Sequence, residues 1–237
     1  MERLDKILAS AGKWSRKEAR TLIRGGRLLA DGIPVRDPSA KFDPESVRLT
    51  ADGVDIRYRR TTWVMLNKPA GYLSATEDRH GPTVLDLLPP ELRNLFPVGR
   101  LDKDTVGLLL LTNDGPLAHA LLSPRRHVEK VYEARVAGRL TDEDVTAFRE
   151  GVTLADGLRC LPAGLEILSA GDAESLCRVT LREGKFRQVR RMLGERGKPV
   201  LFLERIRMGN LTLDASLKRG SFRFLTEEEV ENLGIFS

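Results

Sequence analysis

A charged loop at residues 97–107 is the segment of this sequence best suited to chemistry. It carries Asp102 and Asp104 and lies directly before an apolar stretch. Charged side chains beside a buried strand need a physical reason, and a carboxylate in such a place is a candidate for catalysis. Alternatively, Asp102 and Asp104 form ordinary surface ion pairs with Arg100 and Lys103. The loop by itself leaves both interpretations open.

The standard motifs of metal, nucleotide and hydrolase chemistry are missing from the sequence. It contains no Gly-x-Gly-x-x-Gly, no Walker lysine loop, no His-Glu-x-x-His and no nucleophile elbow. Cys160 and Cys177 are isolated, which is typical of buried thiols in a reducing compartment. We therefore expect no metal site, no cofactor and no disulfide.

Strands and helices must position this loop. Strands are predicted at 63–66, 108–111, 176–182, 200–203, 211–213 and 222–225, and helices at 83–88, 116–122, 141–150, 185–196 and from Thr226, where Glu229 completes a capping box. Few long crossover helices separate the strands, which favours a mixed, largely antiparallel sheet over a doubly wound parallel one. The predicted fold class is α+β.

The excess positive charge lies in the first quarter of the chain. Residues 1–60 contain 14 Lys and Arg against 9 Asp and Glu, which accounts for the whole net charge of +5. A basic module on a neutral body is typical of nucleic-acid binding, although a solvated basic face would give the same count. No apolar run is long enough for a membrane span, so we expect a cytoplasmic protein.

Within this module we expect two short helices followed by a small sheet. The second helix begins with a capping box, Ser15 and Glu18, and Asp-Gly pairs at 31–32 and 52–53 predict hairpins. Cations suited to a phosphate backbone lie along the second helix: Arg16, Lys17, Arg20 and Arg24. A polar segment at 57–62 is the expected linker, which gives domains at 1–60 and 61–237.

The module resembles the S4 RNA-binding domain. The resemblance rests on Arg3-Leu4-Asp5-Lys6, Ser15-Arg16, Leu22-Ile23 and Asp31-Gly32. The family usually has Val-Asn-Gly where this chain has Ala30-Asp31-Gly32, and this departure leaves the hairpin intact. S4 domains occur in ribosomal proteins, synthetases and modification enzymes, so this module predicts RNA binding without choosing an activity.

The body resembles the RsuA/RluB/RluE/RluF branch of pseudouridine synthases. The resemblance is carried by residues 99–115, from Gly99-Arg100-Leu101-Asp102 to Asn113-Asp114-Gly115, and by 66–71, 129–132 and 183–192. It implies that Asp102 is the catalytic aspartate, Tyr132 the active-site tyrosine and Lys185 its basic partner. A carboxylate kept ionised by a neighbouring ammonium suits attack on either the sugar or the base. Tyr132 would position the uracil, and its alternative is an ordinary core aromatic.

A stacked base is out of reach of the enzyme, so the resemblance also implies base flipping. Arg100 resembles the arginine that related synthases place into the vacated stack, and its alternative is an ion pair with Asp104. We assign Lys68, Arg187, Arg190 and Arg191 to RNA binding as well. The three arginines would lie on the polar side of a helix whose Phe186 faces inward, where a solvated basic face is the alternative.

The resemblance is strongest to enzymes of the small ribosomal subunit. Residues 74–78, 82–85 and 123–125 carry it. We expect a monomer that isomerises the family's uridine 516 in 16S rRNA or a small-subunit assembly intermediate. The alternatives are a 23S rRNA target for the same reaction, a non-catalytic S4 assembly factor, and a glycosidase. A glycosidase would need a second catalytic carboxylate, and none is evident in this sequence.

Overall fold

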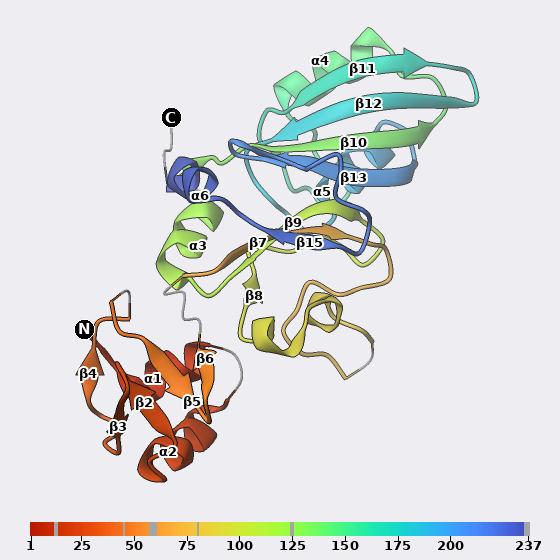
Figure 1. Cartoon of the computed structure of the whole chain (residues 1–237). Helices are drawn as coiled ribbons and strands as arrows, with labels where there is room; N and C mark the ends of the chain where they lie inside the picture. The colour runs from red at the N-terminus through yellow and green to blue at the C-terminus, as the bar shows by residue number, and fades with distance from the viewer. Residues whose placement is uncertain (12–13, 45, 57–60, 80, 124–125, 235–237) are drawn as a thin grey trace. The chain divides into compact units, whose positions relative to one another are not determined.

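The computed structural model describes residues 1–11, 14–44, 46–56, 61–79, 81–123 and 126–234. The chain forms two compact units, one of Met1–Thr62 with Leu88–Phe96 and the other of Trp63–Leu87 with Pro97–Ser237 (Figure 1). Most of the linker expected at 57–62 falls outside the described residues. In the ranges given, no helix is both long and apolar enough to cross a membrane.

Two helices of the first unit share a core with its sheet. Helix α1 spans Leu4–Ser10, and α2 spans Arg16–Arg24. The predicted capping box is confirmed, because the Glu18 amide donates to the Ser15 hydroxyl at 3.3 Å and the Ser15 amide donates to the Glu18 carboxylate at 2.7 Å. Apolar side chains from both helices pack on strand residues, which holds α2 with its polar face exposed.

The sheet of this unit is antiparallel, with the order β3-β2-β5-β6 among the described residues. Its strands are β2 (Leu28–Ala30), β3 (Ile33–Val35), β5 (Leu49–Ala51) and β6 (Val54–Ile56), and a separate pair joins β1 (Glu2–Arg3) to β4 (Lys41–Phe42). Asp31 and Asp52 both have a φ of 50°. Each is followed by a glycine of positive φ, the requirement of a two-residue hairpin turn, so both predicted hairpins are confirmed.

A mixed sheet organises the second unit. Its path runs β11-β12-β10-β13-β9-β7-β15, with β14 paired to β13. The strands are β7 (Trp63–Lys68), β9 (Val106–Thr112), β10 (Lys130–Ala137), β11 (Gly164–Ala170), β12 (Glu174–Leu181), β13 (Val200–Met208), β14 (Leu211–Thr212) and β15 (Phe222–Phe224). Strand β13 is parallel to β9, and the other pairs along this path are antiparallel. The α+β class with a mixed, largely antiparallel sheet is therefore confirmed.

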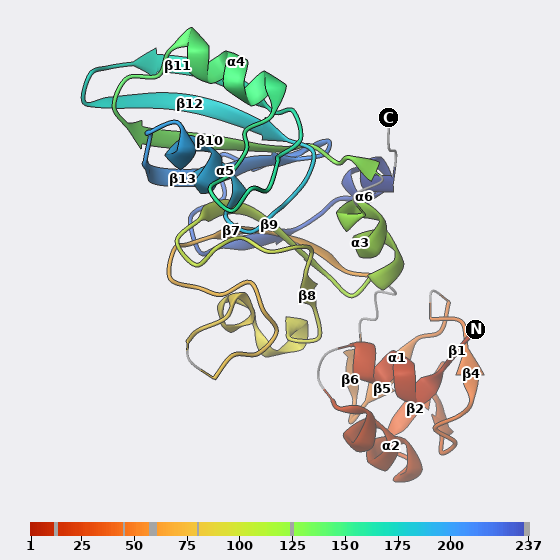
Figure 2. The same cartoon turned by 180° about the vertical axis from the view of Figure 1, so that it is seen from behind.

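Helices α4 (Asp142–Glu150) and α5 (Gln188–Glu195) cover the same face of this sheet (Figure 2). Phe148 of α4 and Met192 of α5 are fully buried in one apolar cluster with side chains of β10, β12 and β13. Helices α3 (Gly115–Leu122) and α6 (Glu227–Gly234) lie beside each other (Figure 1). Short 3-10 turns occupy Val84–Leu87, where an α-helix was predicted, and Pro90–Leu92. The two-residue strand β8 spans Phe96–Pro97.

The helix predicted at 185–196 begins three residues late, at Gln188. Arg187 has a φ of 48°, in the left-handed region, so the chain cannot be helical across it. The prediction that Phe186 faces inward is consequently wrong, because this side chain precedes the helix and is 77% exposed.

Strands β10 and β11 have no counterpart among the predicted elements. The β10–β13 pairing contains two register shifts, which break the two-residue alternation that predicts a strand. Strand β11 lies at the sheet edge and buries little of its surface, so its sequence carries little apolar signal.

Candidate active site

Asp102, Tyr132 and Lys185 line one pocket in the second unit. The pocket has a volume of about 70 Å³, and its wall also includes Arg100 and Arg187. Three separate segments supply these residues: the loop before β9, strand β10 and the turn before α5. The structure thus brings together residues more than 80 positions apart in the chain.

A buried lysine shapes the loop that carries Asp102. The Lys68 ammonium donates to the backbone carbonyls of Asp102 at 3.1 Å, Lys103 at 3.3 Å, Thr105 at 2.8 Å and Pro69 at 3.1 Å. Burial lowers the pKa of Lys68 to about 8, although the carboxylates of Asp104 and Asp102 oppose the shift. The charge is kept in the interior because carbonyl dipoles surround it.

The assignment of Lys68 to RNA binding is therefore wrong. Its side chain is 0% exposed and cannot reach a phosphate. A lysine at the end of an apolar strand has the sequence signature of a surface cation, and only its long-range contacts with the loop explain its burial.

Ser74 holds the other side of the same loop. Its hydroxyl accepts from the Leu101 amide at 3.1 Å and donates to the Leu101 carbonyl at 3.0 Å, and the group is buried. Lys68 and Ser74 together fix the backbone on both flanks of the Asp102 side chain. Neither residue was predicted to serve the site in this way.

Gly107 allows the first residues of β9 to approach β13 closely. Its φ is 98°, and a Cβ atom there would lie 2.4 Å from the carbonyl oxygen of Arg205. Arg205 is buried on β13 opposite Gly107, and its Nε donates to the Leu108 carbonyl at 2.8 Å. The parallel contact between β9 and β13 therefore depends on a glycine five residues after Asp102.

Asp104 forms ion pairs with two arginines of the α5 region. Its carboxylate lies 3.2 Å from Arg187 and 3.1 Å from Arg190. Arg100 lines the pocket as an exposed side chain, and no ion pair joins it to Asp104 in the described part of the chain. The alternative of an Arg100–Asp104 pair is thus not what the structure contains.

The three arginines near α5 do not form the expected phosphate-binding row. The Arg190 side chain is 14% exposed and also donates to the Val200 carbonyl at 3.1 Å, so its assignment to RNA binding is wrong. Arg191 pairs with Asp156. Arg187 alone of the three lines the pocket.

Lys185 is held by Glu183 and not by Asp102. Its ammonium lies 3.4 Å from the Glu183 carboxylate and donates to the Arg159 carbonyl at 2.6 Å. Gln188 donates to Glu183 at 2.6 Å and accepts from the Lys185 amide at 3.0 Å, which closes the network. The ammonium expected to neighbour Asp102 thus lines the same pocket but forms no direct ion pair with it in the described part of the chain, because Lys185 pairs with its near neighbour in sequence.

Tyr132 serves the pocket and the core together. It is half-buried, lines the pocket and packs against the apolar cluster beneath α4 and α5. A register shift between Val131 and Tyr132 changes the pairing with β13 at this residue, and such irregularities often re-aim a side chain beside an active site.

The cations predicted on the first unit lie on α2. Arg16, Lys17, Arg20 and Arg24 are all exposed. The Arg20 guanidinium lies 2.9 Å from the buried carboxylate of Asp5, which Arg3 also contacts at 3.0 Å. Hydrogen bonds from Arg3 and Arg20 lower the pKa of Asp5 to about 2, against the effect of its burial.

Among the described residues, no group of three carboxylate, histidine or cysteine side chains could hold a metal ion.

Two family models match the chain. The first, described as RNA pseudouridylate synthase, covers residues 62–195, and the second, described as S4 domain, covers residues 2–47.

Pseudouridine synthases also match the chain over nearly their whole length. The chain is 44% identical to the uncharacterized RNA pseudouridine synthase YtzG of Bacillus subtilis, with 98% of each covered. It is 39% identical to ribosomal small subunit pseudouridine synthase A of Escherichia coli, with 98% of this chain and 99% of that protein covered. A crystal structure of a pseudouridylate synthase has a TM-score of 0.69 at 33% identity and covers 98% of this chain and 100% of its own. The chain therefore belongs to the RNA pseudouridylate synthases of the RsuA type and is an S4-containing isomerase that acts on RNA.

Proposed function

We propose that this enzyme isomerises uridine 516 of 16S rRNA to pseudouridine, with Asp102 as the catalytic carboxylate. The observation that carries the reaction is the shared pocket of Asp102, Tyr132 and Lys185. The target is supported by relatives named ribosomal small subunit pseudouridine synthase A, which are 38% to 41% identical to the chain.

The reaction breaks the C1′–N1 bond, turns the uracil and joins C5 to C1′. C5 loses a proton and N1 gains one, so no other reactant is consumed. The Asp102 carboxylate supplies the anion that attacks either C1′ or a base carbon. Both routes require the carboxylate at a fixed position, and the contacts of Lys68 and Ser74 to its loop provide this.

Tyr132 and Lys185 act on the environment of Asp102. The Tyr132 ring gives the flipped uracil a surface against which to pack, and Lys185 contributes positive charge to the pocket while its ammonium pairs with Glu183. The pocket is smaller than the roughly 300–1,000 Å³ of sites for drug-sized ligands, so it suits a single flipped uridine and not a longer stretch of RNA. Arg100, exposed at the wall, would occupy the stack that the base leaves.

RNA affinity would come chiefly from the exposed cations of α2: Arg16, Lys17, Arg20 and Arg24. We place the S4 domain at residues 1–60 and the catalytic domain at 61–237. We propose a monomer that acts in the cytoplasm, where its rRNA substrate is made. Arg187 would contact the RNA next to the pocket, and Arg191 would do so only by exchanging Asp156 for a phosphate.

Tritium release from 16S rRNA labelled at uridine C5 tests the reaction. The wild-type protein should release tritium, and Asp102→Asn should release at most a thousandth as much. Asp104→Asn is the matched control, because it makes the same change of charge in the same loop at a carboxylate that pairs with Arg187 and Arg190 and does not line the pocket. A wild-type protein that releases no tritium would favour a non-catalytic assembly factor, and free uracil among the products would indicate a glycosidase.

Mapping of pseudouridine in rRNA from a deletion strain tests the target. We expect one modification to be lost, at position 516 of 16S rRNA. Loss of a pseudouridine from 23S rRNA instead would support the proposed reaction and refute 16S rRNA as the target. Comparing naked 16S rRNA with small-subunit assembly intermediates in the tritium assay would identify the substrate form.

A further inference from the structure

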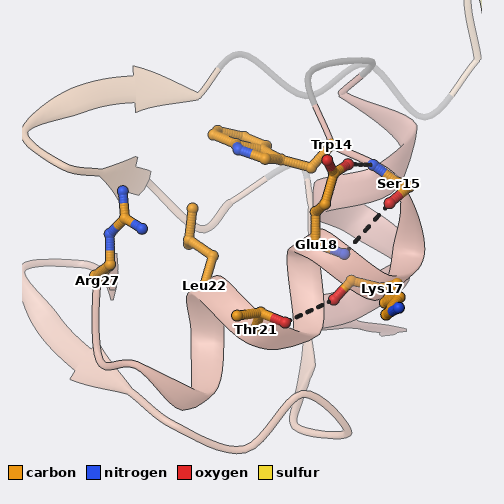
Figure 3. Close-up of a pocket in the computed structure, with 7 residues that line it drawn as sticks. All are labelled: Trp14, Ser15, Lys17, Glu18, Thr21, Leu22 and Arg27. Atoms are coloured by element: carbon orange, nitrogen blue, oxygen red, sulfur yellow. Dashed lines mark hydrogen bonds between the residues drawn. The ribbon is translucent and has the colours of Figure 1, made fainter.

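A second pocket lies at the start of α2 in the first unit. It has a volume of about 520 Å³ and is lined by Trp14, Ser15, Lys17, Glu18, Thr21, Leu22 and Arg27 (Figure 3). This volume is within the range of about 300–1,000 Å³ for small-molecule sites. The pocket shares no residue with the one that contains Asp102.

The pocket offers a flat aromatic surface. Trp14 precedes the helix cap at Ser15 and packs, half-buried, against the apolar core of the unit. Its ring and the tip of Leu22 bound the same hollow in Figure 3. A tryptophan whose ring is supported from below and open on one side can stack on a base of any identity.

Polar groups surround this surface. Arg27 and Lys17 lie on opposite sides of the pocket in Figure 3, and the Arg27 guanidinium is fixed by Asp52, to which its Nε donates at 2.8 Å. The Glu18 carboxylate also lines the hollow, and its pKa is lowered by the hydrogen bond from the Ser15 amide. A free phosphate would meet this carboxylate, whereas the N–H groups of a base could donate to it.

We propose that this pocket binds one unpaired base of the RNA, stacked on Trp14, with the flanking phosphates attracted by Lys17 and Arg27. The mixture of an aromatic face, cations on two sides and a carboxylate matches a nucleotide within a chain better than an isolated anion. Recognition of unpaired bases by stacking is the usual basis of specificity for single-stranded RNA. The S4 unit then selects an unpaired segment in addition to supplying phosphate affinity, whichever uridine is modified.

Fluorescence of Trp14 tests the stacking directly. The sequence has two tryptophans, and the other, Trp63, is buried in β7, so the full-length Trp63→Phe protein reports on Trp14 alone. Hexaadenylate RNA should quench this emission, and a hexamer of abasic ribose phosphates with the same charge should not. Equal quenching by both probes, or none by either, would overturn the proposal.

Variants separate the ring from the charges. Trp14→Leu keeps an apolar side chain on the core and removes the aromatic face, and it should weaken hexaadenylate binding about tenfold or more. Lys17→Ala should weaken binding and reduce the salt slope by about one. Lys41→Ala, an equal change of charge on β4 outside the pocket, should preserve the quenching seen in the Trp63→Phe protein.

If the Trp14→Leu and Lys17→Ala proteins both bound hexaadenylate with unchanged affinity and had native circular dichroism, the proposal that this pocket binds a base would be refuted. The titration requires no isomerisation, so its result is independent of tritium release. Quenching without tritium release would support base binding at Trp14 and refute the proposed reaction. Tritium release without quenching would support the reaction and refute base binding at Trp14.

Discussion

The Lys68 ammonium donates to the backbone carbonyl of Asp102 at 3.1 Å, so a buried cation holds the loop of the proposed catalytic residue from behind. The contact is to the peptide and not to the carboxylate, whose oxygens stay available to the pocket. The positive charge also lies close enough to Asp102 and Asp104 for both carboxylates to affect its pKa. Lys68 therefore fixes the position of Asp102 and places a positive charge near it, although its buried side chain cannot contact RNA.

Replacement of this lysine should damage both stability and activity. Lys68→Met keeps the length of the side chain and removes the donor for four carbonyls. Buried groups left without partners cost about 1–3 kcal/mol each, so we expect the free energy of unfolding to fall by about 3 kcal/mol or more. Urea unfolding and tritium release measure the two effects. The exposed Lys103→Met in the same loop is the control, and equal effects of the two changes would contradict the role of Lys68.

The ion pairs of Asp5 should make the first unit sensitive to acid. The pKa of Asp5 is about 2 in the folded protein, against an ordinary value of 3.8. The carboxylate therefore stabilises the fold by about 2 kcal/mol above pH 3.8, and this contribution is lost as the pH falls toward 2. Asp5→Asn should lower the free energy of unfolding by that amount at pH 7, and the difference from wild type should shrink below pH 3.8.

Urea unfolding at several pH values measures this difference. Asp55→Asn breaks an exposed pair with Arg48 and should cost less than about 1 kcal/mol. A wild-type advantage over Asp5→Asn that stayed constant down to pH 2.5 would contradict the titration of Asp5.

Removing the charge of Glu183 should disturb the position of Lys185 in the pocket. Glu183→Gln keeps the size of the side chain and leaves the Lys185 ammonium without its carboxylate partner. The ammonium is then held less firmly beside the pocket, so kcat for tritium release should fall about tenfold. Glu166→Gln removes an exposed carboxylate paired with Arg178 and should leave kcat unchanged. An unchanged kcat in the Glu183→Gln enzyme would contradict this positioning role.

A side chain at position 107 should separate β9 from β13. The Cβ atom of Gly107→Ala would overlap the Arg205 carbonyl, and the positive φ adds strain. We expect a loss of at least about 2 kcal/mol in the free energy of unfolding, with a fall in tritium release. Gly115 begins α3, and no atom lies within 4 Å of a Cβ added there. Gly115→Ala should therefore leave the free energy of unfolding unchanged or raise it slightly. Thermal unfolding distinguishes the two, and a stable Gly107→Ala protein would show that the strands can separate without penalty.

Local signals predicted a large part of the fold. The capping box of Ser15 and Glu18 and the Asp-Gly turns at 31–32 and 52–53 act within a few residues, so their structural result follows from the sequence nearby. Apolar runs predicted β7 and β9 because both strands are buried along their whole length. The motifs around Asp102, Tyr132 and Lys185 predicted which residues meet in one pocket.

The sequence by itself thus determined the family, the α+β class and the members of the pocket. Only the tertiary structure decided what each charged side chain contacts. Lys68 is buried because carbonyls up to 37 positions away surround it, and Arg190 is not available to RNA because its side chain is largely buried and donates to the Val200 carbonyl. Phe186 is exposed because Arg187 turns the chain before α5 begins. A charged residue has the same sequence signature whether water or buried carbonyls solvate it, so its role depends on contacts that are distant in sequence.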